Sequence, residues 1–165
     1  MTTRAPRTGE KDGGDYFFVS QADFERMEKA EDFLESARVF DQSYGTPKSY
    51  VMDCLNAGEK VILAIDIQGM KKIKKLYASQ IPMVTIFLLP PSIKVLRERL
   101  EGRKTEAAEE IERRIAIAQE EIKAAKLYDF TVMNQSLEQT VLEIEAFIEK
   151  TEKDRRENAN ALRPA

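Results

Sequence analysis

Two strongly apolar runs constrain the architecture of this chain more than any other feature. Residues 61–65 (Val-Ile-Leu-Ala-Ile) lie between Gly58 and Asp66, and residues 83–89 end at a Pro-Pro pair. Runs of this length without polar alternation predict strands that are buried on both faces, as in a parallel sheet. A third short run at residues 130–133 predicts a further strand. Because amphipathic segments separate these strands, we expect an α/β protein with helices packed on the faces of a parallel sheet.

Helical periodicity marks most of the remaining chain. Helices are expected over residues 21–30, 47–57, 68–77, 92–100, 106–126 and 136–152. Short strands are expected at residues 16–19, 33–35 and 38–40. Ser20 is expected to cap the first helix, with Asp23 three residues later. After a turn at residues 44–47, Thr46 is expected to cap the second helix and Pro47 to occupy its first position.

The composition excludes several kinds of chemistry. The 165 residues contain no histidine and one cysteine, Cys54, which rules out histidine-based triads, internal disulfides and multi-cysteine zinc sites. Lys and Arg number 26 and Asp and Glu number 29, so the net charge of −3 argues against nucleic-acid coating. No run is long enough for a membrane helix, and the N-terminal segment lacks the apolar region of a signal peptide. We expect a cytoplasmic protein without nucleic-acid or membrane partners and without its own metal site.

Two arginines in the N-terminal segment are candidates for binding an anion. Arg4 and Arg7 lie three residues apart in a polar stretch, and each guanidinium offers planar donors that match a phosphate. The hydroxyls of Tyr16 and Tyr44 can add further donors. The alternative is a solvated basic loop beside tyrosines that belong to the core.

Glu35 is a candidate for selecting a base. It follows Phe33 and Leu34, so we expect it beside apolar surface, where an ionised carboxylate acts only as a hydrogen-bond acceptor. Guanine presents adjacent N–H donors on its Watson–Crick edge and adenine does not, so a half-buried Glu35 would favour guanine. The alternative is an ordinary exposed carboxylate.

An arginine-rich stretch around Gly102 is a third candidate. Such a segment, following a strand–helix unit, can close over phosphates and neutralise the charge of a transferring phosphoryl group. The alternative is ordinary pairing with glutamates one helical turn away. The arginines of the stretch are Arg97, Arg99, Arg103, Arg113 and Arg114.

Two polar residues, Asp66 and Asn134, directly follow predicted strands, at the edge where parallel sheets bind ligands.

No phosphate-binding loop of the Gly-x-x-x-x-Gly-Lys-[Ser/Thr] kind occurs in the sequence. Gly9 and Gly14 have the spacing, but Asp15 and Tyr16 follow them in place of Lys and a hydroxyl residue. A Gly-Lys pair is found nowhere in the 165 residues.

The segment TTRAPRTGEKDGGDYFFVS, residues 2–20, resembles the GMP-binding signature of guanylate kinases, which is close to TTRxPRxGExxGxDYxFV. The resemblance continues in order along the chain and covers roughly residues 2–150. The further matching segments are Phe33-Leu34-Glu35, Tyr44-Gly45-Thr46, Ile65-Asp66-Ile67-Gln68-Gly69, Pro90-Pro91-Ser92 and Arg99-Leu100-Glu101-Gly102-Arg103.

The resemblance implies a P-loop-kinase type of fold, a three-layer parallel sheet with two attached parts. A small GMP-binding αβ subdomain would span about residues 14–48, and a helical lid about residues 98–120. The domain as a whole would cover residues 1–152, and residues 153–165 would form a charged, flexible tail.

The resemblance also implies transfer of a phosphoryl group from ATP to GMP, giving ADP and GDP, with Mg²⁺ bound to the ATP. Arg99, Arg103 and Arg114 would be catalytic, and Arg103 and Asn134 would contact ATP. The GMP site would comprise Arg4, Arg7, Glu10, Tyr16, Glu35, Tyr44, Thr46 and Asp66.

We expect the protein to be a monomer or a weak homo-oligomer.

One departure from the family pattern bears on activity. In the family a strand, a phosphate-binding loop and a helix precede the Thr-Thr-Arg segment, where this sequence has only Met1. That loop holds the ATP phosphates and Mg²⁺, so we expect the chain as written to bind GMP but to transfer phosphoryl groups weakly or not at all. We also expect the missing strand to leave neighbouring strand edges unpaired. The alternative function is a catalytically dead guanylate-kinase-like module that binds GMP or a phosphorylated partner.

Overall fold

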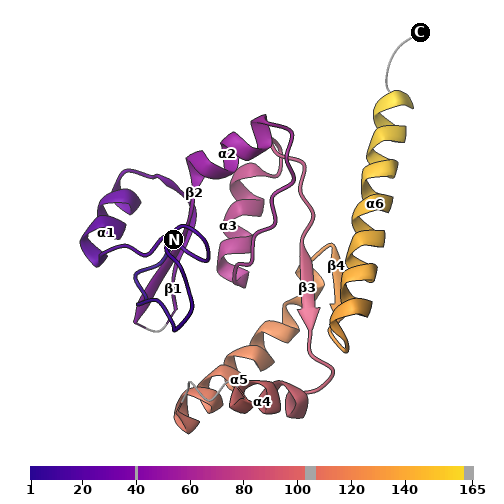
Figure 1. Cartoon of the computed structure of the whole chain (residues 1–165). Helices are drawn as coiled ribbons and strands as arrows, with labels where there is room; N and C mark the ends of the chain where they lie inside the picture. Colours follow the sequence, from indigo (N-terminus) through magenta and orange to yellow (C-terminus); the bar gives the residue numbers. More distant parts are fainter. Residues whose placement is uncertain (40, 103–106, 162–165) are drawn as a thin grey trace. The chain divides into compact units, whose positions relative to one another are not determined.

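The computed structural model describes residues 1–39, 41–102 and 107–161, and the chain divides into two units, Met1–Pro82 and Met83–Ala165. The first unit contains an antiparallel pair of strands and the second a parallel pair (Figure 1). The mixed α/β class is therefore as predicted. None of the described helices is long and apolar enough to cross a membrane. The elements of the first unit are α1 (Gln21–Lys29), β1 (Phe33–Val39), β2 (Gln42–Pro47), α2 (Lys48–Asn56) and α3 (Ile67–Tyr77).

Aromatic packing holds α1 on β1. Phe24 on α1 is only 2% exposed and stacks on Phe33 at the start of β1, with the ring centroids 4.7 Å apart. Gly45 on β2 lies against the same rings, because a Cβ there would come within 2.9 Å of Phe33. Helix α3 also packs against β1 and buries Met70 and Ile73. Helices α1 and α3 thus both pack on β1, whereas α2 contacts β2.

The segment at residues 42–47 is a strand and not the predicted turn. It forms β2, which pairs antiparallel with β1 so that Thr46 lies opposite Glu35. Helix α2 begins only at Lys48, after Pro47, and no side chain caps it. The prediction that Thr46 and Pro47 open a helix is wrong because ladder bonds to β1 outweigh the local turn preference.

The predicted strands at 33–35 and 38–40 are one continuous strand, β1, as far as Val39; residue 40 lies outside the described residues. The segment at residues 16–19, predicted as a strand, forms only isolated bridges, in which Thr2 pairs with Phe18 and Asp12 with Tyr16.

The apolar run before Asp66 is not a strand in this structure. Residues 59–66 have no regular secondary structure, and Ile62 is 89% exposed. Apolar composition favours burial, but a strand also needs a neighbour that exchanges backbone hydrogen bonds with it. No described residue pairs with this run in a sheet. The prediction of a strand buried on both faces is therefore wrong here, although the run still leads directly into α3.

In the second unit, two parallel strands are joined through a helical crossover. The strands pair in register from Ile86↔Phe130 to Leu89↔Met133. The predicted strand at 83–89 is thus shortened to its last four residues, whereas the prediction at 130–133 is confirmed. The elements are β3 (Ile86–Leu89), α4 (Ile93–Gly102), α5 (Ala108–Lys123), the 3₁₀ helix η1 (Ala125–Leu127), β4 (Phe130–Met133) and α6 (Leu137–Ala161).

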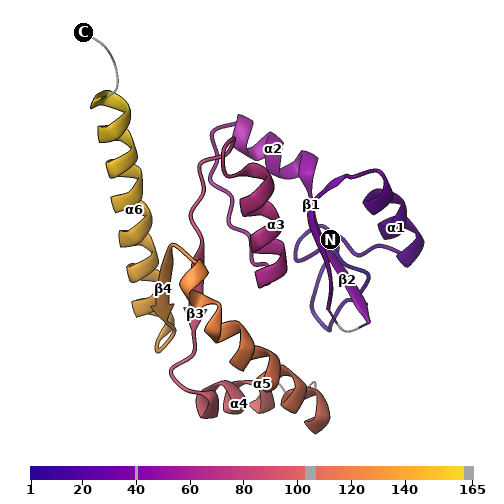
Figure 2. The same cartoon turned by 180° about the vertical axis from the view of Figure 1, so that it is seen from behind.

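Helix α6 covers β4, and Figure 2 shows it running beside the parallel pair. Phe147 on α6 stacks on Phe130 of β4, with the ring centroids 4.5 Å apart and the planes 7° apart. The helix continues to Ala161, beyond the end near residue 152 that the sequence predicts. Flexibility of this charged segment stays a prediction, and residues 162–165 lie outside the described part of the chain.

Helices α4 and α5 form a hairpin with its own small apolar core. Leu100, Ile111 and Ile115 are buried there, and Ile93 and Leu96 pack against them. This spacing of three and four residues is the pattern from which both helices are predicted.

Ser20 caps α1 as predicted, and its replacement by alanine is expected to destabilise the protein by about 1 kcal/mol. Its side chain accepts a hydrogen bond from the Asp23 backbone N–H at 3.1 Å, and its hydroxyl donates to the Asp23 carboxylate at 2.7 Å. Chemical denaturation of Ser20→Ala and of Ser49→Ala, an exposed serine within α2, measures the difference. Equal stability of the two variants would contradict the capping role.

Candidate functional site

The N-terminal segment is tied between two other parts of the first unit. Thr2 is fully buried; its backbone N–H donates to Phe17 O at 2.9 Å, and its carbonyl accepts from the Val19 N–H at 3.0 Å. Its hydroxyl donates to Ser43 O at 3.0 Å, and the Ser43 N–H donates to Thr3 Oγ1 at 2.9 Å. These bonds fix the point from which the next residue, Arg4, projects. Thr2 and Thr3 were not among the predicted site residues. The only feature of the sequence that could have indicated them is that they belong to the matching Thr-Thr-Arg segment.

Arg4 is held from several directions. Its Nη1 and Nη2 atoms donate to the two carboxylate oxygens of Glu10, each at 2.9 Å, and Nη1 also donates to Ala5 O at 2.8 Å. The guanidinium carbon lies 5.4 Å from the Tyr16 ring centroid and 5.8 Å from that of Phe18. The hydrogen bond that Arg4 donates to Glu10, and more weakly the one with Tyr44, raises the pKa of Arg4. The guanidinium is therefore a fixed positive charge.

Glu10 joins the two arginines of this segment. Besides binding Arg4, its Oε2 atom accepts a hydrogen bond from the Arg7 backbone N–H at 2.7 Å. The Arg4 hydrogen bond lowers the pKa of Glu10, with a further contribution from the Arg7 backbone bond. An ionised Glu10 thus fixes both the side chain of Arg4 and the backbone of Arg7, whose own side chain is exposed.

The tyrosines proposed for the same site lie together. The rings of Tyr16 and Tyr44 are 6.3 Å apart in an edge-to-face arrangement. Tyr44 lies on β2 and forms an antiparallel bridge with Thr2. The Arg4 guanidinium and the rings of Tyr16 and Tyr44 therefore lie together, and their binding of an anion stays a prediction.

Glu35 lies in a buried position on β1. It is only 4% exposed, and its Oε1 atom accepts a hydrogen bond from the Thr46 hydroxyl at 2.7 Å. Burial raises the pKa of Glu35, and the neighbouring carboxylate of Asp66 adds to this, while the Thr46 bond and the positive charge of Lys72 oppose it. The alternative of an exposed carboxylate does not hold for Glu35.

Asp66 begins α3 close to Glu35. Its Oδ1 atom accepts a hydrogen bond from the Gly69 backbone N–H at 2.8 Å, which makes Asp66 the N-cap of the helix. The sequence indicates Gly69 only as a member of the matching segment at residues 65–69 and predicts no role for it. The structure shows that a Cβ at Gly69 would lie 2.8 Å from Glu35 Oε2, so this glycine borders the buried carboxylate directly.

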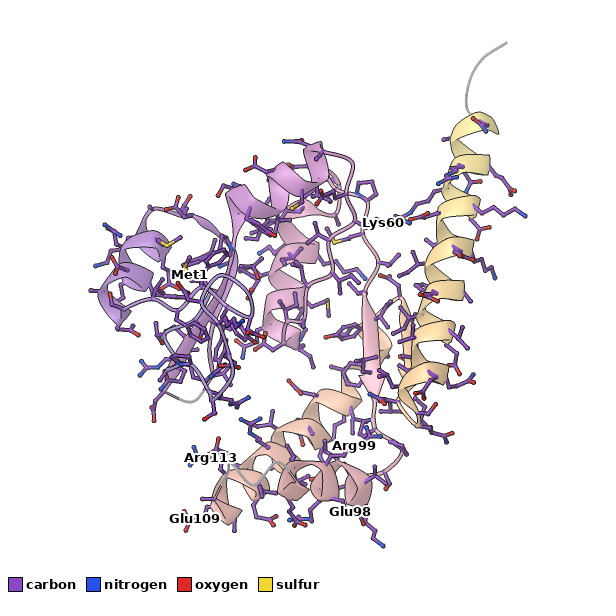
Figure 3. All side chains as sticks on the ribbon, in the orientation of Figure 1. Met1, Lys60, Glu98, Arg99, Glu109 and Arg113 are labelled. Atoms are coloured by element: carbon purple, nitrogen blue, oxygen red, sulfur yellow. The ribbon has the colours of Figure 1, made fainter. Side chains whose placement is uncertain are left out.

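The second unit holds the other predicted site residues. Figure 3 labels Arg99 on α4 and Arg113 on α5. The Arg99 Nη2 atom donates to the backbone carbonyl of Asn134 at 2.9 Å, and the Asn134 N–H in turn donates to Leu89 O at 2.8 Å. Two predicted ligand contacts are therefore joined at the carboxyl ends of β3 and β4. Arg103 lies outside the described residues.

Two arginines of the hairpin pair with glutamates, but only Arg114 does so one helical turn away, as the alternative interpretation expected. Arg114 lies 3.5 Å from Glu110 one turn earlier on α5, and Arg97 of α4 binds both oxygens of Glu112 on α5. Arg97 therefore ties the two helices of the hairpin together.

Among the described residues, no three His, Cys, Asp or Glu side chains are grouped closely enough to hold a metal ion. The site of the first unit instead presents a basic, aromatic part around Arg4 and an acidic, buried part around Glu35. A ligand with an anionic group and a base bearing N–H donors matches this division.

Comparison with known proteins identifies the family. The family model described as guanylate kinase matches residues 1–151. The guanylate kinase of Clostridioides difficile is 47% identical over 147 residues, covering 89% of this chain and 70% of that protein. The enzyme of the same name from Caldanaerobacter subterraneus is 45% identical over 156 residues, covering 93% of this chain and 74% of that protein.

A solved structure agrees with these relatives. The crystal structure of guanylate kinase from Anaplasma phagocytophilum matches with a TM-score of 0.76 at 33% identity, covering 91% of this chain and 72% of that chain. The fold is accordingly that of an α/β nucleotide kinase, and the chain belongs to the guanylate kinase family.

Proposed function

We propose that this chain binds GMP in its first unit and takes part in phosphoryl transfer from ATP to GMP, which yields ADP and GDP for purine nucleotide metabolism in the cytoplasm. The observation that carries the proposal is the pairing of a fixed guanidinium–tyrosine cluster with a buried carboxylate in one unit. The relatives named guanylate kinase support this assignment.

The GMP phosphate is proposed to bind the cluster around Arg4. Three N–H bonds of the Arg4 head group are already used by Glu10 and Ala5, so the guanidinium is held before ligand arrives. Arg7, which is exposed, and the hydroxyls of Tyr16 and Tyr44 supply further donors. Preorganisation of this kind reduces the entropy lost on binding.

Guanine is proposed to bind against Glu35, with Thr46 and Asp66 beside it. The Thr46 hydroxyl already bonds Glu35 Oε1, which leaves Oε2 and the remaining lone pairs as acceptors for N–H donors of the base. Adenine has no donor at the equivalent ring nitrogen, so it would leave a buried carboxylate oxygen unpaired.

The second unit is proposed to act on the transferring phosphoryl group and ATP. Arg99, Arg103 and Arg114 would neutralise developing charge, and Asn134 and Arg103 would contact ATP. The proposed lid, residues 98–120, begins within α4 and ends within α5. Mg²⁺ would arrive with ATP, since it is held largely by phosphates and water in such sites; no step is assigned to it.

The 165-residue chain as it stands is proposed to have weak or no kinase activity, because its sequence contains no Gly-x-x-x-x-Gly-Lys-[Ser/Thr] loop. A coupled assay of ADP release with ATP, GMP and Mg²⁺ tests this. Little GMP-dependent release together with intact GMP binding is expected. Turnover like that of a guanylate kinase that contains this loop would overturn the proposed weakness, and a chain that binds a phosphopeptide but not GMP would favour the binding module.

Replacing Glu10 by glutamine is expected to weaken GMP binding by roughly three- to tenfold, because a neutral amide holds the Arg4 guanidinium less firmly. Calorimetric titration measures the change, with Glu25→Gln on the exposed face of α1 as the matched control. The difference between wild type and Glu10→Gln should shrink as pH falls through the lowered pKa of Glu10, since protonation removes the same charge. Stronger GMP binding by Glu10→Gln would show that Glu10 repels the phosphate instead.

A further inference from the structure

We propose that Gly69 is a specificity-determining position for guanine, since its lack of a side chain allows the Glu35 carboxylate to occupy its buried place. The inference rests on the proposed GMP site and adds a residue that makes no side-chain contact with the base. Gly69 would act through Glu35, and so it is a positioning residue.

The contact between these residues leaves no space for a methyl group. A Cβ on Gly69 would lie 2.8 Å from Glu35 Oε2 and 3.2 Å from its carboxyl carbon, and 3.4 Å from Asp66 Oδ1. Both carboxylates of the proposed base site thus border this one glycine. Any side chain at position 69 forces Glu35 to move.

The movement would be specific to Glu35 and not a general disruption of the fold. The two atoms that a Cβ would approach most closely belong to the end of the Glu35 side chain, whereas Asp66 Oδ1 lies at the ordinary contact distance of 3.4 Å. Neighbouring α3 residues such as Met70 and Ile73 are buried where this helix packs against β1. Because Thr46 holds Oε1 at 2.7 Å, a displaced carboxylate would lose or stretch that bond. The acceptors would then no longer face a base in the arrangement that reads guanine.

Local conformation gives no other reason for glycine at this position. Gly69 is the third residue of α3, and its backbone φ is not in the left-handed region that favours glycine. Glycine disfavours a helix relative to alanine. The close approach of Glu35 therefore accounts for a residue that helix propensity alone would disfavour.

The experiment compares GMP with IMP, which lacks the exocyclic amino donor of guanine. Calorimetric titrations of the full 165-residue chain are expected to show that Gly69→Ala lowers the GMP-to-IMP affinity ratio by about tenfold, the scale for one lost polar recognition contact. Gly102→Ala is the matched control, because Gly102 is also helical and a Cβ there meets no atom of the described residues within 4 Å. The GMP-to-IMP affinity ratio of Gly102→Ala should equal that of the wild type.

Two results would overturn the inference while leaving the proposed GMP site intact. One is an unchanged ratio in Gly69→Ala; the other is an equal loss of affinity for both nucleotides. Failure of the wild-type chain to bind GMP would instead overturn the proposed function, and the inference with it.

Thermal unfolding provides an independent test if Gly69→Ala folds poorly. Gly69→Ala is expected to lower the unfolding midpoint in the wild-type background but not in a Glu35→Ala background, where the clashing atoms are gone. An equal decrease in both backgrounds would show that Gly69 is constrained by something other than Glu35, and would overturn the proposal.

Discussion

Replacing Glu35 by glutamine is expected to weaken GMP binding by about 10- to 100-fold without reducing the stability of the fold. Glutamine keeps the size of the side chain and its acceptor for Thr46, but it replaces one acceptor oxygen with an N–H₂ group. That group would face a guanine donor, so two donors would oppose each other in a position that is only 4% exposed. Glu149→Gln, an exposed replacement on α6, is the matched control.

The pH dependence of stability gives the same prediction a second readout. Burial raises the pKa of Glu35, so the folded state keeps this proton to a higher pH than the unfolded chain does. Stability contributed by the group is therefore lost as pH rises from the unfolded pKa through the raised folded pKa. Glu35→Gln should be as stable as the wild type or more stable at pH 7, with the advantage disappearing in acid. A variant that is less stable at pH 7 and binds GMP normally would assign Glu35 a structural role only.

Replacing Arg4 by lysine is expected to weaken GMP binding by about 10- to 100-fold, although the positive charge is kept. A lysine ammonium cannot make the paired bonds to both Glu10 oxygens while also lying over the Tyr16 and Phe18 rings. The phosphate would then meet a mobile charge in place of a fixed planar donor set. Titration with GMP measures the loss.

Arg26→Lys on α1 is the control for this replacement. Arg26 also pairs with a carboxylate, that of Asp23 at 2.8 Å, but its side chain is 76% exposed and lies outside the proposed site. Its exchange should leave the GMP affinity unchanged. If Arg4→Lys and Arg26→Lys both bind GMP as the wild type does, the phosphate does not bind at Arg4.

The sequence predicts the local elements better than it predicts the sheet. The Ser20 cap and the helices that follow apolar spacing are present because their causes are local: a capping hydroxyl and a periodic apolar face. The run before Asp66 is not a strand, because ladder partners are a property of the whole chain and cannot be read from the run itself. The strand at residues 42–47 was missed for the same reason.

The site shows a similar division. The sequence offers Arg4, Tyr16, Tyr44 and Glu35 as candidates because their residue types suit the chemistry of phosphate and guanine. The position of the Glu35 carboxylate depends on contacts between distant segments, namely its hydrogen bond with Thr46 and its close approach to Gly69. Spacing along the chain gives no access to these contacts, since they depend on how β1, β2 and α3 pack.

The most direct test of a GMP site in the first unit is calorimetric titration of the 165-residue chain with GMP and, separately, with AMP. AMP carries the same phosphate but lacks the paired N–H groups from which Glu35 is proposed to accept hydrogen bonds. We expect saturable binding of one GMP per chain and an affinity for AMP at least about tenfold lower. Equal affinity for both nucleotides, or no binding of GMP, would contradict it.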